Sequence, residues 1–342
     1  VGGRKGDETK ILLADGHSGW VDTKYLEFLL PGAHPPRAET DVVVMRAMET
    51  GVSVRVGLGD RVPFSIEAAE DLSALTVRLH YASLHTNWMV YNGSDDFIDE
   101  VRLKQESPAI VAMTIRLKSG RRLWGYQSAF EGNALRVELR RPPAIARSGS
   151  PLNGIRVFLD PGHMPSASGA FGPLGTREMD VNFAIARAAE KLLLKEGAVP
   201  LLSRSSEDDE VGLAERPRMA VEKNADVFVS IHNNNLVSGR NPFRGPPNGH
   251  SVFYYHSHSL ALARSIHEAF KVHVPLPSEE LRFGNLLVCR MTAMPAVLTE
   301  SAYMTLPEQE ALLLDPAFRL KVASGIVDGL RSFLKQFKGR KP

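Results

Sequence analysis

The chain of 342 residues is 43% hydrophobic and 23% charged, which is typical of a globular protein, and its length favours two domains. Basic and acidic residues number 41 and 39, so the formal net charge of +2 gives no support for a nucleic-acid partner. No apolar run reaches the roughly 18 residues that a membrane-spanning helix needs. The only cysteine, Cys289, excludes an intrachain disulfide and a cysteine-rich metal site. Any metal would therefore depend on histidines and carboxylates.

Residues 1–30 form a short N-terminal segment that cannot bury a core of its own. Within it, Leu12–Val21 predicts a hairpin. The tripeptide Gly19-Trp20-Val21 resembles the end of a bacterial Src-homology-3-like wall-associated domain, so we interpret residues 1–30 as a remnant of such a domain or a tail. Because the chain begins without Met and without a signal peptide, we expect it to be a mature or trimmed portion.

Residues 40–142 predict an all-β, sandwich-like domain. Short segments alternate between apolar and polar side chains and are separated by turn sequences such as Asn92-Gly93 and Ser119-Gly120. The four clearest predicted strands are Val52–Val56, Leu75–His80, Ile110–Leu117 and Ala134–Leu139. The polar, Pro- and Gly-containing residues 143–153 then predict a linker.

Residues 154–338 predict an α/β domain with a twisted, mostly parallel sheet and helices on both faces. Helical spacing marks Met179–Glu196 and residues 316–337. The predicted strands are Ile155–Asp160, Ala198–Ser203, Asp226–His232, Ser251–Tyr255, Leu286–Arg290 and Ala296–Glu300.

Three of these strands end at a potential catalytic side chain. The first runs into the turn Asp160–His163, the second ends on His232 and the third on Glu300. In an open α/β sheet the carboxyl ends of the strands form the ligand crevice, so we expect these side chains to converge. Two histidines and acidic groups at one crevice indicate a catalytic zinc site and a metal-assisted hydrolase.

The same region resembles the zinc-dependent N-acetylmuramoyl-L-alanine amidases of type 3, which cut peptidoglycan between the lactyl group of muramic acid and the stem peptide. The motifs that carry the resemblance occur in one order: Leu159–His163, Gly169-Ala170, Gly172–Gly175, Glu178, Asp180–Asn182, Ala225–Asn234 and Pro295–Glu300. The resemblance implies that His163, Glu178 and His232 bind one zinc ion and that Glu300 is catalytic.

Each assignment has a structural alternative. His163 would cap its turn, His232 would be a core histidine, and Glu178 would favour the positive end of a helix dipole. Glu300, which follows apolar residues, should have a pKa raised by desolvation, or else would pair with Arg290. Outside this set, Asn234 is a candidate for substrate binding.

Two segments differ from the family pattern. The residues after His163 are usually small and Gly-rich, whereas here Met164–Ser168 intervenes, which we expect to alter the substrate cleft. The segment Leu236–Asn248 is too short for the inhibitory helix that some relatives carry there. We therefore expect a cleft that the chain itself does not block.

Residues 40–142 resemble the AMIN type of envelope-targeting domain, through strand rhythm and Val101–Glu106. Of the aromatic residues there, Trp88, Tyr91 and Trp124 are expected to stack on sugars or to fill the core. The sequence as a whole predicts a periplasmic or secreted, wall-associated zinc amidase whose partners are peptidoglycan and, as an open question, an activator protein. The alternatives are a zinc peptidase that cuts another peptidoglycan amide and a wall-binding protein without catalysis.

Overall fold

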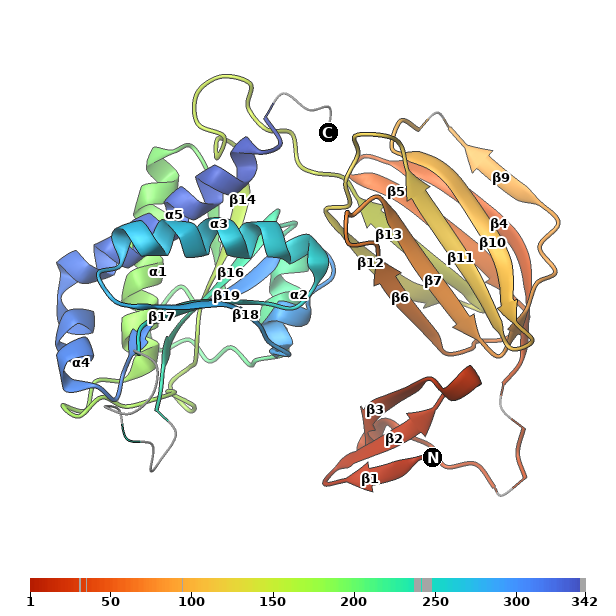
Figure 1. Cartoon of the computed structure of the whole chain (residues 1–342), viewed down its shortest axis with the longest axis horizontal. Coiled ribbons are helices and arrows are strands. Elements are labelled where there is room, and N and C mark those ends of the chain that lie inside the picture. Colours follow the sequence, from red (N-terminus) through yellow and green to blue (C-terminus); the bar gives the residue numbers. More distant parts are fainter. Residues whose placement is uncertain (31, 35, 94, 237–240, 242–247, 339–342) are drawn as a thin grey trace. The chain divides into compact units, whose positions relative to one another are not determined.

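The computed structural model describes residues 1–30, 32–34, 36–93, 95–236, 241 and 248–338. The chain divides into two compact units, Val1–Arg141 and Pro142–Pro342 (Figure 1). No helix in the described ranges is long and apolar enough to cross a membrane.

The first unit begins with a small antiparallel sheet of three strands. These are β1 (Gly3–Lys5), β2 (Glu8–Leu12) and β3 (Ser18–Asp22), with the short 3-10 helices η1 (Ala14–Gly16) and η2 (Thr23–Tyr25). The predicted hairpin corresponds to β2 and β3.

The rest of the first unit is all β, as predicted, and contains two sheets whose facing side chains form one hydrophobic core. The first sheet has the order β10 (Ile98–Ser107), β11 (Ile110–Leu117), β7 (Ala74–His80) and β6 (Phe64–Ala68). The second has the order β12 (Gly125–Glu131), β13 (Ala134–Arg140), β5 (Gly51–Leu58), β4 (Ala38–Met48) and β8 (Ala82–Ser83), and β9 (Met89–Asn92) also pairs with β4. Each of the four clearest predicted strands lies inside one of these.

The three aromatic side chains singled out in this region divide between core and surface. Trp124 is 1% exposed and is a core residue, whereas Trp88 and Tyr91 are 64% and 56% exposed. Only the last two remain available for contact with a ligand.

The second unit is built on a six-stranded sheet. Its order is β15 (Val199–Leu202), β14 (Arg156–Pro161), β16 (Val227–Asn234), β19 (Ala296–Tyr303), β17 (His250–Tyr254) and β18 (Ser278–Phe283). All neighbouring pairs are parallel except β17 and β19. The prediction of a mostly parallel sheet is therefore confirmed, with one antiparallel pairing.

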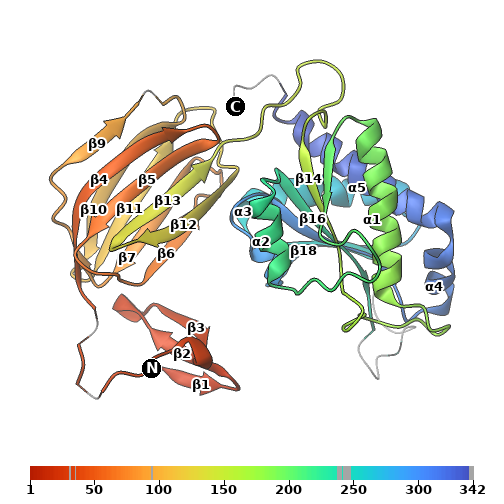
Figure 2. The same cartoon turned by 180° about the vertical axis from the view of Figure 1, so that it is seen from behind.

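Among the residues that the structure describes, five helices surround this sheet: α1 (Glu178–Lys195), α2 (Glu215–Glu222), α3 (Ser257–His273), α4 (Pro307–Leu314) and α5 (Pro316–Lys335). Helix α5 packs against both α1 and α3. Its approach to α3 is close because Gly329 has no side chain, and a Cβ there would collide with the backbone of Ile266. Helix α2 lies across β14 and β16 from α1 (Figure 2).

One predicted strand was wrong. Residues Leu287–Arg290 form the 3-10 helix η3, and the sixth strand is β18, Ser278–Phe283. A short apolar run fits a buried helical turn as well as a buried strand, so its pattern cannot decide. Strand β18 lacks an apolar pattern because it lies at the sheet edge and carries charged residues. Cys289 in η3 is buried, and burial raises the pKa of its thiol to about 12, so it is an inert thiol.

Candidate metal centre

The first histidine of the centre is held on a tight turn after β14. His163 has a positive φ of 69°, which is unusual for a residue with a side chain and which persists only where surrounding contacts enforce it. Arg216 Nη2 provides such a contact by donating to the His163 carbonyl oxygen at 2.6 Å. The preceding Gly162 is also required, because a Cβ there would collide with the imidazole of His232.

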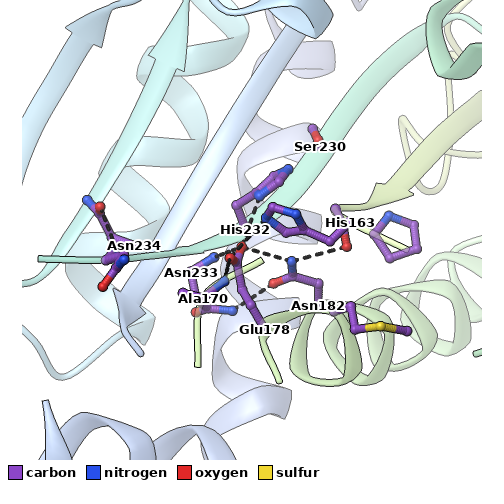
Figure 3. Close-up of polar contacts among 12 residues, drawn as sticks. His163, Ala170, Glu178, Asn182, Ser230, His232, Asn233 and Asn234 are labelled. Carbon is purple, nitrogen blue, oxygen red and sulfur yellow. Dashed lines mark hydrogen bonds and ion pairs between the residues drawn. The ribbon is translucent and has the colours of Figure 1, made fainter. Parts of the chain in front are cut away.

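Glu178 joins the two histidines. As the first residue of α1, it places Oε2 2.9 Å from His163 Nε2 and Oε1 3.0 Å from His232 Nδ1. One ligand atom from each of the three residues lies within 4.8 Å of the others. Figure 3 shows the side chains of His163, Glu178 and His232 gathered at one place. The structure therefore brings together the three predicted metal ligands, which come from three separate elements.

These donors suit zinc. Two imidazole nitrogens and one carboxylate are a common catalytic zinc set, which leaves a further coordination position open. Burial acts to raise the pKa of Glu178, but hydrogen bonding to His163 and His232 and their charges outweigh it, so this pKa lies well below its ordinary value. Glu178 is thus an anion at neutral pH, the form in which a carboxylate binds a metal. The space around the Glu178 carboxylate and the His163 imidazole is narrow, because a Cβ at Gly169 would collide with both side chains.

Further donors orient Glu178, and the sequence prediction did not assign them this role. The Ala170 amide donates to Oε2 at 3.0 Å, while the Asn182 side chain and the Asn233 amide donate to Oε1 at 3.1 and 3.2 Å. Asn233 Nδ2 in turn donates to Asn182 Oδ1 at 2.8 Å. The contact of Asn182 with Glu178 could have been inferred from the sequence, because the two residues are one helical turn apart along α1.

Glu300 lies beside this centre on β19, where it is the sheet partner of His232. Its Oε2 atom is buried and has no hydrogen-bond partner among the described residues. Burial, followed by the nearby charges of Glu178 and Glu279, raises the pKa of Glu300 well above its ordinary value, while Arg282 acts in the opposite direction. The predicted direction of the shift is confirmed. In the described part of the chain Glu300 forms no ion pair with the alternative partner, Arg290.

Strand β18 contributes a second buried carboxylate near Glu300 that the sequence analysis missed. Glu279 accepts hydrogen bonds from the Tyr303 hydroxyl at 3.0 Å, the Gly249 amide at 2.8 Å and Arg282 Nη2 at 2.6 Å. These three donors hold the Glu279 carboxylate in place near Glu300.

Asn234 lies apart from the cluster of the two histidines and Glu178, as Figure 3 shows. Its Oδ1 atom accepts a hydrogen bond from the Asn235 amide at 2.8 Å. A role in substrate binding stays a prediction.

Two further histidines, His256 and His258, lie at the start of α3. His256 is the N-cap residue, and its Nε2 lies 2.9 Å from the Arg290 carbonyl oxygen. His258 is buried within the first turn. The sequence predicts that no inhibitory helix lies between Leu236 and Asn248. Most of this segment lies outside the described residues, so this stays a prediction.

Comparison with known proteins identifies the family. The probable cell wall amidase LytH of Staphylococcus epidermidis is 34% identical over 199 residues, which are 58% of this chain and 64% of that protein. The N-acetylmuramoyl-L-alanine amidase LytC of Bacillus subtilis is 32% identical over 190 residues, 54% of this chain and 37% of that protein. The chain thus spans less than two thirds of the length of either relative.

A solved structure shares the fold of the second unit. The N-acetylmuramoyl-L-alanine amidase from Clostridium difficile 630 is 28% identical with a TM-score of 0.50, and the match covers 54% of this chain and 98% of that chain. The model of the N-acetylmuramoyl-L-alanine amidase family matches residues 157–332, about half of the chain, and this range includes His163, Glu178, His232 and Glu300. The chain therefore belongs to the N-acetylmuramoyl-L-alanine amidase family Amidase_3.

Proposed function

We propose that the protein hydrolyses the amide bond between the lactyl group of N-acetylmuramic acid and the L-alanine of the peptidoglycan stem peptide. The observation that carries this proposal is the cluster of His163, Glu178 and His232, with the half-buried Glu300 in register with His232 on the next strand. Family membership supports the choice of amide.

The imidazoles of His163 and His232 and the Glu178 carboxylate would hold one zinc ion. When bound, zinc supplies a Lewis acid that activates a water molecule and polarises the scissile carbonyl. Asn182 and the Asn233 amide keep the Glu178 carboxylate facing both imidazoles. Arg216 holds the backbone of His163.

Glu300 carries the proton in this proposal. As a carboxylate it accepts a proton from the attacking water, and as an acid it delivers that proton to the departing amine nitrogen. Its raised pKa suits the delivery of the proton, because a carboxyl group whose pKa lies above the ordinary value takes up and holds a proton more readily. No other buried carboxylate among the described residues lies on the strand next to His232 without a hydrogen-bond partner.

The test is digestion of purified peptidoglycan by the zinc-loaded protein and by its Glu300→Gln variant, with products identified by mass. Free stem peptides that begin with L-alanine, beside intact glycan strands, are expected from the wild type only. Removing the general acid and base should lower the rate by about 10²–10⁴-fold. Intact zinc content in the variant is the control.

The same digestion distinguishes the alternatives. Cuts inside the stem peptides would identify a peptidase. Absence of cleavage by a wild type that carries zinc would favour a wall-binding role. If a partner protein then restored cleavage, that partner would be the activator.

For the β strands of the first unit we infer an AMIN-like targeting role, which would place the enzyme on the cell wall outside the cytoplasm. The exposed rings of Trp88 and Tyr91 support it, because aromatic faces stack on sugar rings. The test is co-sedimentation of the full chain with insoluble peptidoglycan. Trp88→Ala and Tyr91→Ala should weaken the binding, while Leu320→Asn on the exposed surface of α5 should not.

A further inference from the structure

An apolar cavity of about 340 Å³ opens directly beside the metal centre and shares His163 and His232 with it. Its walls are mainly aliphatic, with Met164, Val211, Leu213, Leu286, Leu287 and Leu298 among them. Cavities that hold small molecules begin at about 300 Å³. The cavity is therefore large enough for more than a single methyl group.

The two charged residues that line this cavity are already satisfied. Arg216 donates to the side chain of Asp160 and to the carbonyl oxygens of Pro161, His163 and Val211. Asp160 also accepts from the Ser203 and Ser230 hydroxyls at 2.7 Å each. With these groups engaged, a group that enters the cavity gains chiefly from apolar contact.

Leu213 is an exposed part of the cavity wall. It lines the cavity, yet its side chain is 57% exposed. Met164 lines the cavity as well, at the position after His163. Contact with a substrate would remove both side chains from water.

The position of Glu300 indicates which part of the substrate enters. Leu298 precedes Glu300 by two residues on β19, so both side chains lie on the same face of the sheet. Leu298 lines the cavity and Glu300 is not among its lining residues. Because Glu300 delivers the proton to the departing amine, the amine side of the bond must lie toward Glu300. The acyl side then points toward the cavity.

We propose that this cavity is the subsite for the acyl side of the scissile bond, which takes the lactyl methyl group and the adjoining apolar part of the muramic sugar. The proposal rests on the proposed amidase function. It assigns Leu213 and Met164 to recognition of the lactyl group, and it assigns no contact to the alanine methyl group on the amine side.

The test compares synthetic disaccharide peptides that differ by one methyl group. The first pair has a lactyl ether or a glycolyl ether, and the second pair has L-alanine or glycine as the first peptide residue. Since one methyl group in an apolar pocket changes kcat/KM by about 10-fold or more, the wild type should prefer lactyl over glycolyl by that factor. Leu213→Asn should reduce the preference to about 2-fold, because it removes apolar contact.

The alanine-to-glycine ratio is the internal control and should be the same in the wild type and in Leu213→Asn. Leu320→Asn makes the same substitution at a side chain on α5 that is 47% exposed, and it should leave both ratios unchanged. Met164→Gly should reduce the lactyl preference as Leu213→Asn does.

Binding provides a second measurement that needs no turnover. The dissociation constants of the lactyl and glycolyl compounds are measured by calorimetry on Glu300→Gln, with and without Leu213→Asn. The lactyl preference should appear in the first protein and be lost in the second. A change in the alanine-to-glycine ratio instead would assign the cavity to the amine side and overturn the proposal, as would no change in any ratio.

Failure of the proposed function gives a different result. In that case the wild type would cleave neither lactyl nor glycolyl compounds and would release no stem peptides from peptidoglycan. An active wild type whose ratios do not respond to Leu213→Asn would refute the subsite alone.

Discussion

Arg216 Nη1 lies 2.7 Å from Asp160 Oδ1, in an ion pair whose side chains are only 4% and 1% exposed. The pair links α2 to the end of β14, immediately before the turn that carries His163. Because Arg216 also donates to the carbonyl oxygens of Pro161 and His163, the pair fixes the backbone of the metal ligand. Asp160 therefore acts on the centre through Arg216 and the backbone, without belonging to the ligand set.

Arg216→Ala should destabilise the protein strongly. Removing one partner of a buried ion pair leaves the other charge uncompensated, which costs about 3–5 kcal/mol. Denaturant unfolding measures this loss. The matched control is Arg218→Ala on the same helix, which breaks exposed ion pairs with Glu215 and Glu222 and should cost about 1 kcal/mol or less. Similar losses for the two variants would contradict the role given to Arg216.

Asn182→Ala should weaken zinc binding without removing a ligand. Asn182 Nδ2 donates to Glu178 Oε1, and loss of such a supporting contact lowers metal affinity by about 10–100-fold. Competition with a chromophoric chelator measures the affinity. Asn234→Ala serves as the control, since its side chain lies away from the cluster and its substitution should leave zinc affinity unchanged.

Glu300→Gln should stabilise the zinc-free protein increasingly as pH rises. The pKa of Glu300 is raised in the folded state, so its contribution to stability is fully present below the ordinary carboxyl pKa and is lost as pH rises through the folded pKa. Glutamine has no such dependence. The advantage of the variant should therefore grow by up to about 1.4 kcal/mol for each pH unit between those two values.

Thermal or denaturant unfolding of both zinc-free proteins from pH 4 to pH 9 gives this difference. A stability difference that does not change with pH would show that Glu300 is not held with a raised pKa. The experiment separates the electrostatic cost of Glu300 from its part in catalysis, because no substrate is present.

Zinc should raise the stability of the wild type and not that of His163→Ala. A ligand that binds only the folded state at 100 times its dissociation constant adds about 2.7 kcal/mol. The measurement is the unfolding transition with and without zinc, with return to the original value on addition of a chelator. Equal stabilisation of the His163→Ala variant would place the bound ion elsewhere.

Much of the centre could be predicted from the sequence because its residues lie at the start of a helix or toward the carboxyl ends of parallel strands, although β16 continues past His232 to Asn234 and β19 past Glu300 to Tyr303. Apolar runs that stop at His163, His232 and Glu300 mark strands, and parallel strands end at one edge of a sheet. The local pattern thus predicted that these three side chains would meet, whereas the place of Glu178 among the ligands was implied by the resemblance to the amidase family. The predicted strand Leu286–Arg290 was wrong, because an apolar run shows that a segment is buried and does not show its backbone conformation.

The contacts that orient these side chains were decided by the tertiary structure alone. Asn182, Arg216 and Glu279 are polar residues whose sequence neighbours do not reveal which carboxylate or carbonyl they meet. The exposure of Trp88 and Tyr91, in contrast to the burial of Trp124, likewise depends on where each strand lies in its sheet. Periodicity along a chain records which face is buried, whereas hydrogen-bond partners, pKa values and the cavity beside His163 depend on segments far apart in the sequence.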